Sequence, residues 1–334
     1  MTSTSNFSVL KNQKILITGG AGFIAYHLTT ALLKLGVHVV GIDNFDPFYP
    51  KALKEKNLAD LRKTQKELGA NFEFFEIDFC DSLALNRLPT DFSAVIHLGA
   101  KAGVRPSLED PLGYIRANLH GTTAVLEWMQ KSQQRNFIFG SSSSVYGNSS
   151  VAPFKESMAC DKPISPYAAT KRAGELLCAT YQHLYGFQIA ALRFFTVYGP
   201  RQRPDLAIRK FVNAIAQNQK ITLFGDGSSA RDYTFVMDIV AGILGSLTFV
   251  QNHQGPVFEI FNLGNSHPVP LQKMLNTIES AMGVKANIQW EKMQPGDVEI
   301  TCADVSKAKL HLQYQALTPF EDGIRQVVEW SKTL

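Results

Sequence analysis

A glycine-rich turn near the start of the chain lies between an apolar run and an amphipathic run. Residues 14–18 have the composition of a short buried parallel strand, and Gly19-Gly-Ala-Gly22 follows directly, opening an apolar-periodic helix over 26–35. Gly19 allows a tight turn, and Gly22 lets backbone N–H groups at the helix N-terminus approach a pyrophosphate. Glycine turns also join strands to helices where no ligand binds. The order of strand, glycine turn and helix nevertheless predicts a dinucleotide-binding unit.

An acidic residue ends the next predicted strand. Residues 37–42 form this strand and place Asp43 at its carboxyl end, where a carboxylate accepts hydrogen bonds from an adenosine ribose diol. A negative charge there disfavours a 2′-phosphate, so we expect NAD rather than NADP. The third position of the glycine motif is Ala25, which is tolerable if helix and strand pack closely around one methyl group.

Strands and helices continue to alternate beyond this unit, with further strands expected over 72–77, 94–98, 136–139 and 188–193. Such alternation is typical of an α/β fold with a Rossmann-type, doubly wound parallel sheet. After about residue 196 the pattern loosens into proline- and glycine-punctuated segments. We therefore expect an NAD-binding domain over 11–195 plus about 232–262, and a smaller C-terminal α/β substrate domain over 196–231 and 263–334.

The composition is that of an ordinary enzyme. The 334 residues are 45% hydrophobic and 19% charged with a net charge of +4, and no basic run supports nucleic-acid binding. The four cysteines are dispersed, and the eight histidines lack metal-ligand spacing, so we expect reduced thiols and no metal. No apolar signal core or stretch of about 18 apolar residues occurs, which favours a cytoplasmic protein with no membrane partner.

Tyr167 and Lys171 form a candidate acid/base pair. Their i, i+4 spacing places the phenol and the ammonium on one helix face, where the cation would favour the phenolate. Taken alone the pair is a weak signal, because such residues also cover exposed helices. The upstream glycine loop makes the catalytic interpretation the better one.

Several further motifs occur in a fixed order along nearly the whole chain. They are Thr18-Gly-Gly-Ala-Gly22, Asp43-Asn44, Asp78, Ser141-Ser-Ser-Ser-Val-Tyr-Gly147, Tyr167-Ala-Ala-Thr-Lys171, Arg193-Phe-Phe-Thr-Val-Tyr-Gly-Pro200 and Arg231-Asp-Tyr233. Together they resemble the extended short-chain dehydrogenase/reductases of the nucleotide-sugar epimerase and dehydratase type. Within that group, residues 103–107, 203–207 and 294–298 look most like UDP-glucuronate 4-epimerases.

The resemblance implies a catalytic triad of Ser142, Tyr167 and Lys171. Tyr167 would take the proton of the sugar 4-hydroxyl while the hydride leaves C4 for NAD, Lys171 would hold the nicotinamide ribose and lower the tyrosine pKa, and Ser142 would bind the same oxygen. The serine run leaves Ser142 ambiguous by one place. The implied cofactor contacts are Gly19, Gly22, Phe23, Ile24, Asp43, Asn44, Asp78, Phe79, Leu98, Ala100, Lys101, Asn118, Tyr167 and Lys171.

The resemblance also implies how a UDP-sugar is bound. Thr196 and Arg203 match a clamp for the glucuronate carboxylate, although Arg203 before a proline could instead be a solvated loop charge. Arg231 matches a diphosphate contact, against a local pair with Asp232. The full set of implied substrate contacts is Arg105, Ser143, Ser144, Thr196, Arg203, Arg231, Asp297 and Thr301.

Two serines argue against elimination chemistry. Related dehydratases carry an Asp-Glu pair at Ser143 and Ser144, and decarboxylases carry a glutamate at Ser144, because those reactions need proton-transfer groups that a hydroxyl replaces poorly. We therefore expect the 4-keto sugar to be reduced again, so that the reaction is 4-epimerisation of a UDP-sugar. The leading expectation is conversion of UDP-glucuronate to UDP-galacturonate.

Other interpretations stay open at this point. Lys101 resembles the UDP-galactose 4-epimerases, so a UDP-glucose or UDP-N-acetylhexosamine 4-epimerase is the main alternative, and an inactive NAD-binding scaffold is a remote one. Arg201-Gln202 replaces an aromatic-glycine pair that is usual in the family. A homodimer through the helices that contain Trp128 and Tyr167 is expected from the resemblance.

Overall fold

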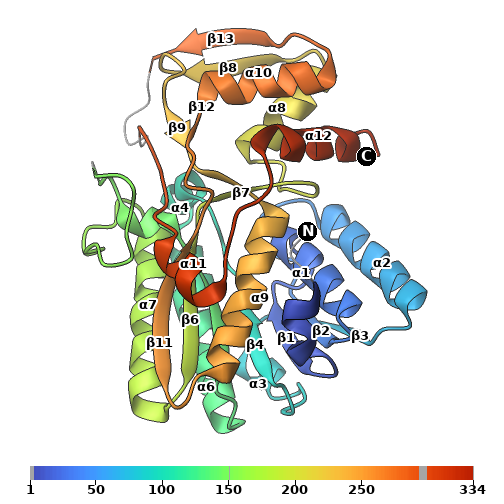
Figure 1. Cartoon of the computed structure of the whole chain (residues 1–334), viewed down its shortest axis with the longest axis vertical. Helices are drawn as coiled ribbons and strands as arrows, with labels where there is room; N and C mark the ends of the chain where they lie inside the picture. The colour runs from blue at the N-terminus through green and yellow to red at the C-terminus, as the bar shows by residue number, and fades with distance from the viewer. Residues whose placement is uncertain (1–3, 150, 293–298, 334) are drawn as a thin grey trace.

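The computed structural model describes residues 4–149, 151–292 and 299–333, and its centre is a seven-stranded sheet (Figure 1). The strand order is β11-β6-β5-β4-β1-β2-β3, and every neighbouring pair is parallel. The strands are β1 (Lys14–Thr18), β2 (His38–Asp43), β3 (Phe72–Glu76), β4 (Ala94–His97), β5 (Asn136–Ser142), β6 (Gln188–Phe194) and β11 (Val257–Leu263). This order confirms the predicted doubly wound α/β fold.

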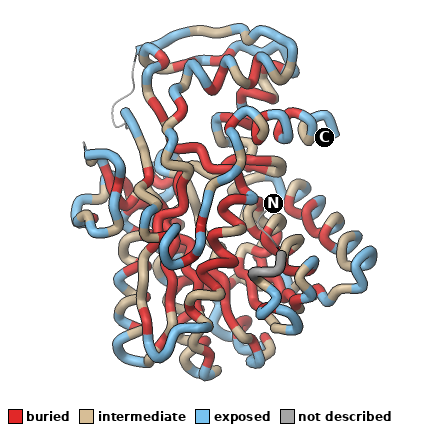
Figure 2. Tube along the Cα trace, viewed as in Figure 1, coloured by how far each residue is buried: buried red, intermediate tan, exposed pale blue. Residues whose placement is uncertain are grey.

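Helices cover both faces of the sheet. One face packs against α1 (Phe23–Lys34), α2 (Lys51–Leu68) and α9 (Val236–Asn252), and the other against α6 (Gly121–Lys131) and α7 (Pro166–Tyr185). β1 shows why both faces are apolar: Ile15 and Ile17 belong to the first core, whereas Leu16 belongs to the second. Because side chains alternate along a strand, a strand buried on both sides must be apolar throughout. Buried residues accordingly run through the middle of the sheet (Figure 2).

Short helical elements fill several of the connections. They are the 3-10 helix η1 (Thr4–Leu10), α3 (Ser82–Leu85), α4 (Val104–Glu109), α5 (Pro111–Tyr114), the π-helix η2 (Ile115–His120) and the 3-10 helix η3 (Ser143–Tyr146). The π-helical turn leads directly into α6. Such turns widen a helix locally and often lie near functional sites.

A smaller group of elements packs beyond the carboxyl ends of the strands, at the top of Figure 1. It contains α8 (Ala207–Ala216), α10 (Leu271–Met282), α12 (Phe320–Ser331), and the parallel pair β8 (Lys220–Phe224) and β13 (Asn287–Glu291). Two further short pairs lie between this group and the sheet: β7 (Thr196–Tyr198) with β10 (Tyr233–Phe235), and β9 (Ala230–Arg231) with β12 (Val269–Pro270). The group has its own core, which includes Ile208, Phe211, Leu275, Ile278 and Phe320.

The chain passes between the two cores several times. It leaves the sheet after β6, returns at α9, leaves again after β11, and returns at α11 (Ser306–Leu312) before ending in α12. The expected domain division placed 263–334 as a whole with the substrate domain. In the structure, however, Ala308, Leu312 and Tyr314 pack into the core that β1 and α9 share. These side chains follow no strand or glycine signal, so the sequence pattern gave no sign of this return.

Candidate active site

A cleft of about 550 Å³ opens at the carboxyl ends of the parallel strands. It is lined by the glycine turn after β1, by the ends of β2, β4 and β5, by the start of α7, and by the segment around β7. Open α/β sheets bind ligands at this edge because loops diverge there and helix N-termini point toward it. Most of the residues implied by the resemblance line this cleft.

The glycine turn leaves no room for a side chain at Gly19 or Gly22. Gly19 has φ +67, and a Cβ built on it would lie 2.9 Å from the Gly99 backbone. A Cβ on Gly22 would lie 2.9 Å from the Gly19 carbonyl oxygen, and Gly22 caps α1 without any side-chain hydrogen bond. The first N–H groups of α1 therefore have no side-chain acceptor at the cap, which fits a site for the pyrophosphate of a dinucleotide.

Asp43 is buried at the end of β2, on the same edge. Its Oδ1 accepts from the Phe45 amide at 2.8 Å and from Lys54 Nζ at 3.1 Å, and both Asp43 and Lys54 line the cleft. The predicted ribose acceptor is thus already paired with a buried lysine from α2. No local pattern predicts this position for Lys54, because a lysine in a mostly polar helix carries no signal for burial.

Tyr167, Ser142 and Lys171 converge on the wall of the cleft. Lys171 Nζ donates to the Gly140 carbonyl at 2.6 Å. Burial raises the pKa of Tyr167, while Ser142, which ends β5, and the positive charge of Arg203 act in the opposite direction. Burial also lowers the pKa of Lys171 to about 8. In this arrangement the Tyr167 phenol is protonated at neutral pH, so it has to lose its proton before it can accept one from a substrate.

The role that the resemblance implies for Lys171, lowering the pKa of Tyr167, stays a prediction. In the described part of the chain, the groups that lower the pKa of Tyr167 are Ser142 and Arg203, whereas the Lys171 ammonium is directed to a backbone carbonyl. The ammonium also lies 5.2 Å from the centre of the Phe139 ring, and Lys171 lines the cleft.

The serine run divides into different environments. Ser141 is buried and donates to Glu175 Oε1 at 2.6 Å, and Glu175 is in turn held by Arg193 in a buried ion pair. Ser142 Oγ donates to Ser144 Oγ and accepts from the Ser144 amide, both at 3.2 Å, and it also acts on the pKa of Tyr167. Ser143 and Ser144 begin η3 and line the cleft. The geometry thus favours Ser142 as the partner of the tyrosine.

Arg203 lies in the cleft with its guanidinium already engaged. Its Nε and Nη2 donate to the two carboxylate oxygens of Asp205 at 3.0 and 2.7 Å, and Nη2 lies 3.4 Å from the Ala102 carbonyl. The guanidinium also stacks over the Phe48 ring at 4.8 Å. An arginine fork that holds one carboxylate bidentately has the geometry to hold another. Thr196, at the start of β7, lines the same cleft.

The remaining predicted cofactor residues form a second rim. Phe23, Ile24, Asn44, Asp78, Phe79, Leu98, Ala100 and Lys101 all line the cleft. Asn118, by contrast, is buried behind the lining and exchanges hydrogen bonds with the Lys101 backbone at 2.8 Å. Lys101 Nζ pairs with Asp110 at 2.7 Å, and Asp78 pairs with Arg116 at 2.7 Å. Asn118 therefore supports the rim rather than facing the cleft.

Three predicted substrate residues lie outside the cleft lining. Arg105 is exposed on α4 and lies over the Phe224 ring of β8 at 5.9 Å. Arg231 donates to the Ala230 carbonyl at 3.1 Å, and Thr301 Oγ1 accepts from the Asp232 amide at 3.1 Å. Asp297 lies outside the described residues.

The local alternative for Arg231, a pair with Asp232, is not found between these two described residues. The buried carboxylate of Asp232 instead accepts from the backbone N–H groups of Asn265, Ser266 and Ala303 at 2.7 to 3.0 Å.

His97 ends β4, directly before cleft-lining residues. Thr122 Oγ1 donates to the Asn118 carbonyl at 2.6 Å and therefore accepts from His97 Nε2 at 3.1 Å, which leaves His97 Nδ1 to accept from Thr18 Oγ1 at 2.7 Å. Burial and the Lys171 charge lower the pKa of His97 to about 3. His97 is thus a neutral core residue.

The family follows from a comparison with known proteins. A model of the NAD dependent epimerase/dehydratase family matches residues 15–264, which include both the glycine turn and the Tyr167–Lys171 pair. The chain belongs to this family. The match confirms the predicted family, and NAD dependence is part of the family's description.

Individual relatives cover nearly the whole chain. A UDP-glucuronate 4-epimerase of Thermodesulfobacterium geofontis is 41% identical, with 95% of each chain covered. The crystal structure of a UDP-glucuronic acid 4-epimerase from Bacillus cereus, in complex with UDP-glucuronic acid and NAD, has a TM-score of 0.88 at 37% identity and covers 96% of this chain and 99% of that one. A UDP-N-acetylglucosamine 4-epimerase from Methanobrevibacter ruminantium has a TM-score of 0.86 at 27% identity, with 97% and 99% covered.

Across the part of the chain that the structure describes, no helix is long and apolar enough to cross a membrane. Within the same residues, no group of three or more histidine, cysteine or acidic side chains is arranged to hold a metal ion.

Proposed function

We propose that this protein is an NAD-dependent 4-epimerase that interconverts UDP-glucuronate and UDP-galacturonate through a transient 4-keto sugar. The observation that carries the proposal is the position of Arg203: its charge acts on Tyr167, so a carboxylate-binding fork and the proton-transfer group share one cleft. A hexuronate has both a 4-hydroxyl and a carboxylate on one sugar ring. The cleft offers a partner for each.

The cofactor fits the residues present. The glycine turn offers uncapped N–H groups to a pyrophosphate, and Asp43 lies at the strand end where an adenosine ribose is recognised. When bound, NAD supplies the group that accepts a hydride from C4 and gives it back. The residues of the chain have to position the sugar and move its proton.

In the proposed mechanism, Tyr167 and Ser142 hold the 4-oxygen between them. The phenolate form of Tyr167 takes the 4-hydroxyl proton as the C4–H bond breaks, and the resulting phenol returns the proton after C4 is reduced on the opposite face of the ring. The Ser142 hydroxyl keeps the oxygen in line with the phenol through the exchange. Lys171 is held at the cleft wall by the Gly140 carbonyl, where its cationic side chain would hold the nicotinamide ribose.

Arg203 has a second task in this proposal. Oxidation at C4 makes a β-keto acid, which loses CO₂ when its carboxylate aligns with the carbonyl orbitals. A bidentate arginine fixes the rotation of that carboxylate and so protects it. Ser143 and Ser144 supply hydroxyls where an elimination or decarboxylation would need a stronger acid or base, so the ketone returns to an alcohol.

The test is an assay of purified protein with UDP-glucuronate, UDP-glucose and UDP-N-acetylglucosamine side by side. We expect UDP-galacturonate from the first substrate with a kcat/KM at least tenfold above the others. A preference for UDP-N-acetylglucosamine would instead support the activity of the Methanobrevibacter neighbour, and no turnover with any substrate would support an inactive scaffold.

We also propose a homodimer that works in the cytoplasm. The supporting observation is the outer side of α7, where Leu176 and Leu184 are 55% and 60% exposed. α7 packs beside α6, and Tyr181 contacts Glu127 between them. Two copies of this helix pair would cover the exposed leucines.

A further inference from the structure

The loop between β7 and α8 carries Arg203, and the residue two places before it has an unusual backbone. Arg201 has φ +67, in the left-handed region that residues with side chains rarely adopt. Such a conformation persists only where surrounding contacts determine it. The contacts of Arg201 therefore indicate what the loop is fixed against.

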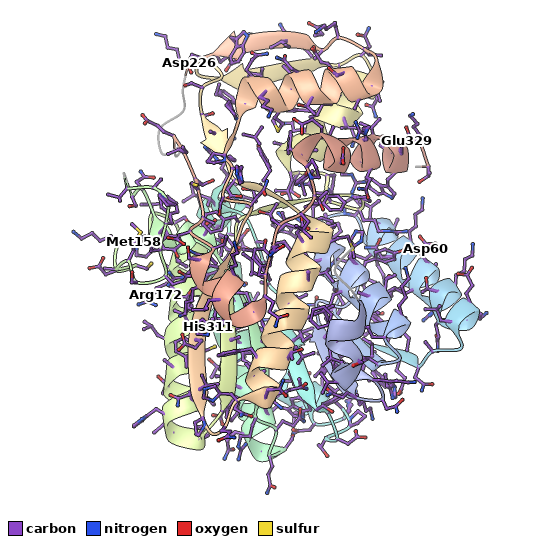
Figure 3. The ribbon with its side chains drawn as sticks, in the orientation of Figure 1. Asp60, Met158, Arg172, Asp226, His311 and Glu329 are labelled. Carbon is purple, nitrogen blue, oxygen red and sulfur yellow. The ribbon has the colours of Figure 1, made fainter. Side chains whose placement is uncertain are left out.

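The Arg201 side chain is held by α1 and α2. Its Nη1 donates to Asn57 Oδ1 at 2.8 Å, its Nη2 pairs with Asp60 Oδ2, and its guanidinium lies 3.8 Å from the centre of the Tyr26 ring. Asp60 is labelled on α2 in Figure 3. A planar fork can bond two acceptors and stack on an aromatic face at once, which a lysine cannot do.

Asn57 extends these contacts to the glycine turn. The side chain is buried, and while its Oδ1 accepts from Arg201, its Nδ2 donates to the Ala21 carbonyl at 3.0 Å. Ala21 lies between Gly20 and Gly22, in the turn that would cradle the cofactor pyrophosphate. One amide therefore connects the phosphate-binding turn to Arg201.

The loop is also fixed on the side toward Arg203. The Pro200 carbonyl lies 2.9 Å from His27 Nε2, Gln202 Nε2 donates to the Val197 carbonyl at 3.0 Å, and the Gln202 carbonyl accepts from Arg209. Each residue from 200 to 202 thus has a fixed partner. Arg203 follows directly with its guanidinium over Phe48. A continuous set of contacts runs from the glycine turn to the carboxylate-binding fork.

We propose that Arg201 is a positioning residue that holds the Arg203 loop against the glycine turn through Asn57, so that the seating of the cofactor and the seating of the substrate carboxylate depend on each other. This inference rests on the proposed function, because it takes Arg203 as the residue that binds the carboxylate. It also explains a departure from the family pattern: Arg201 occupies the place of an aromatic residue, and bonds Asn57 and Asp60 in addition to stacking.

The test uses Arg201→Gly in the NAD-loaded enzyme. Glycine accepts the positive φ without strain, so the variant removes the contacts and leaves the backbone conformation accessible. We expect the KM for UDP-glucuronate to rise at least tenfold and the KM for UDP-glucose to change less than threefold. We also expect bound NAD to be lost at least fivefold faster on dialysis. Asn218→Gly is the matched control, because Asn218 is exposed and has φ +52.

Two further variants separate positioning from general stability. Asn57→Asp keeps the acceptor for Arg201 but cannot donate to Ala21, so it should speed NAD loss more than it raises the KM for UDP-glucuronate. Arg201→Lys keeps the charge without the fork and should recover only part of the selectivity.

The inference is wrong if Arg201→Gly matches Asn218→Gly in both measurements while the wild type turns over UDP-glucuronate. Equal KM increases for both substrates would also overturn it. A wild type that does not use UDP-glucuronate would instead overturn the proposed function, and the NAD-loss measurement would still test the link between Arg201 and the glycine turn.

Discussion

Tyr167 combines two properties that a proton-transfer group needs. It lines the cleft, where a bound sugar can reach it, and Ser142 acts on its hydroxyl to lower the pKa that burial raises. Its ring packs edge-on against Tyr114, with centroids 6.1 Å apart. The ring contact and the hydroxyl contact can therefore be tested separately.

We expect Tyr167→Phe to lower kcat for UDP-glucuronate at least a thousandfold, because the ionisable oxygen is lost while the ring stays in place. Bound NAD and the affinity for UDP-glucuronate should change less than threefold. Tyr114→Phe is the matched control: it loses a hydroxyl that donates to the Ala102 carbonyl and should keep activity within tenfold. Turnover by Tyr167→Phe within tenfold of wild type would remove the tyrosine from the mechanism.

Arg203→Ala should separate two effects of the Arg203 charge, on binding of the substrate carboxylate and on the pKa of Tyr167. The variant loses a bidentate contact worth on the order of 2 to 4 kcal/mol, so the KM for UDP-glucuronate should rise tens- to hundreds-fold while that for UDP-glucose scarcely changes. Because the Arg203 charge also lowers the pKa of Tyr167, kcat should fall for both substrates at neutral pH and recover at higher pH, where more phenolate forms. Both parameters are read from initial rates between pH 7 and 9. Equal KM increases for the two substrates would make Arg203 a general structural residue.

At the scale of elements, the strands were the most predictable part. β1 has the predicted bounds, β3, β4 and β6 differ by one residue at the carboxyl end, and β2 is shifted by one residue toward the carboxyl end. β5 continues three residues further than expected, because Gly140, Ser141 and Ser142 pair with β6 despite their low strand propensity. That extension is what carries Ser142 to Tyr167.

The cleft was predictable to the extent that its residues follow strands. Gly19, Asp43, Asp78 and Ser142 end or follow parallel strands, so topology brings them to one edge. Lys54 and Asn57 come from the interior of a polar helix, and Asp205 from a loop, so their positions depend on packing that no local pattern encodes. Packing also decides where motif residues lie. Three residues that match family motifs lie outside the cleft lining of this structure: Arg105, Arg231 and Thr301.

The exposed side of α7 carries a prediction of its own. If two copies pair through α6 and α7, Leu176→Glu combined with Leu184→Glu should convert the dimer to a monomer, because charges would be buried without partners. Light scattering after size-exclusion chromatography measures the mass. Leu310→Glu on α11 is the control, since Leu310 is 76% exposed and lies on another face. A monomeric wild type, or a Leu310→Glu variant that also dissociates, would contradict the proposed interface.

At the scale of the whole molecule, two buried histidines are expected to lower the free energy of unfolding at acid pH. Burial lowers the pKa of His27 to about 4 and that of His97 to about 3, against 6.5 when exposed. Between these values the unfolded chain binds protons that the folded chain does not, so the free energy of unfolding falls as pH drops below about 6.5. The slope is about 1.4 kcal/mol per pH unit for each histidine.

Urea midpoints at pH 7 and pH 5 measure this slope. His97→Gln should reduce the loss of stability between the two pH values by roughly half of the histidine contribution, while His267→Gln, at an exposed position, should not change it. A loss that is the same in His97→Gln and in wild type would show that His97 is not neutral in the folded protein.

The repeated passage of the chain between its two cores limits how such a protein can change over evolutionary time. A sugar-binding part that is one continuous insert can be exchanged by a single recombination event with two joins. Here the segments that follow β6, β11 and α11 would all have to be replaced together. The replacements would also have to pack against Phe23 and Val236, which belong to the core of the smaller group. New sugar preferences are therefore reached by replacing single residues in the connecting loops, and the substitution of Arg201 is a change of that kind.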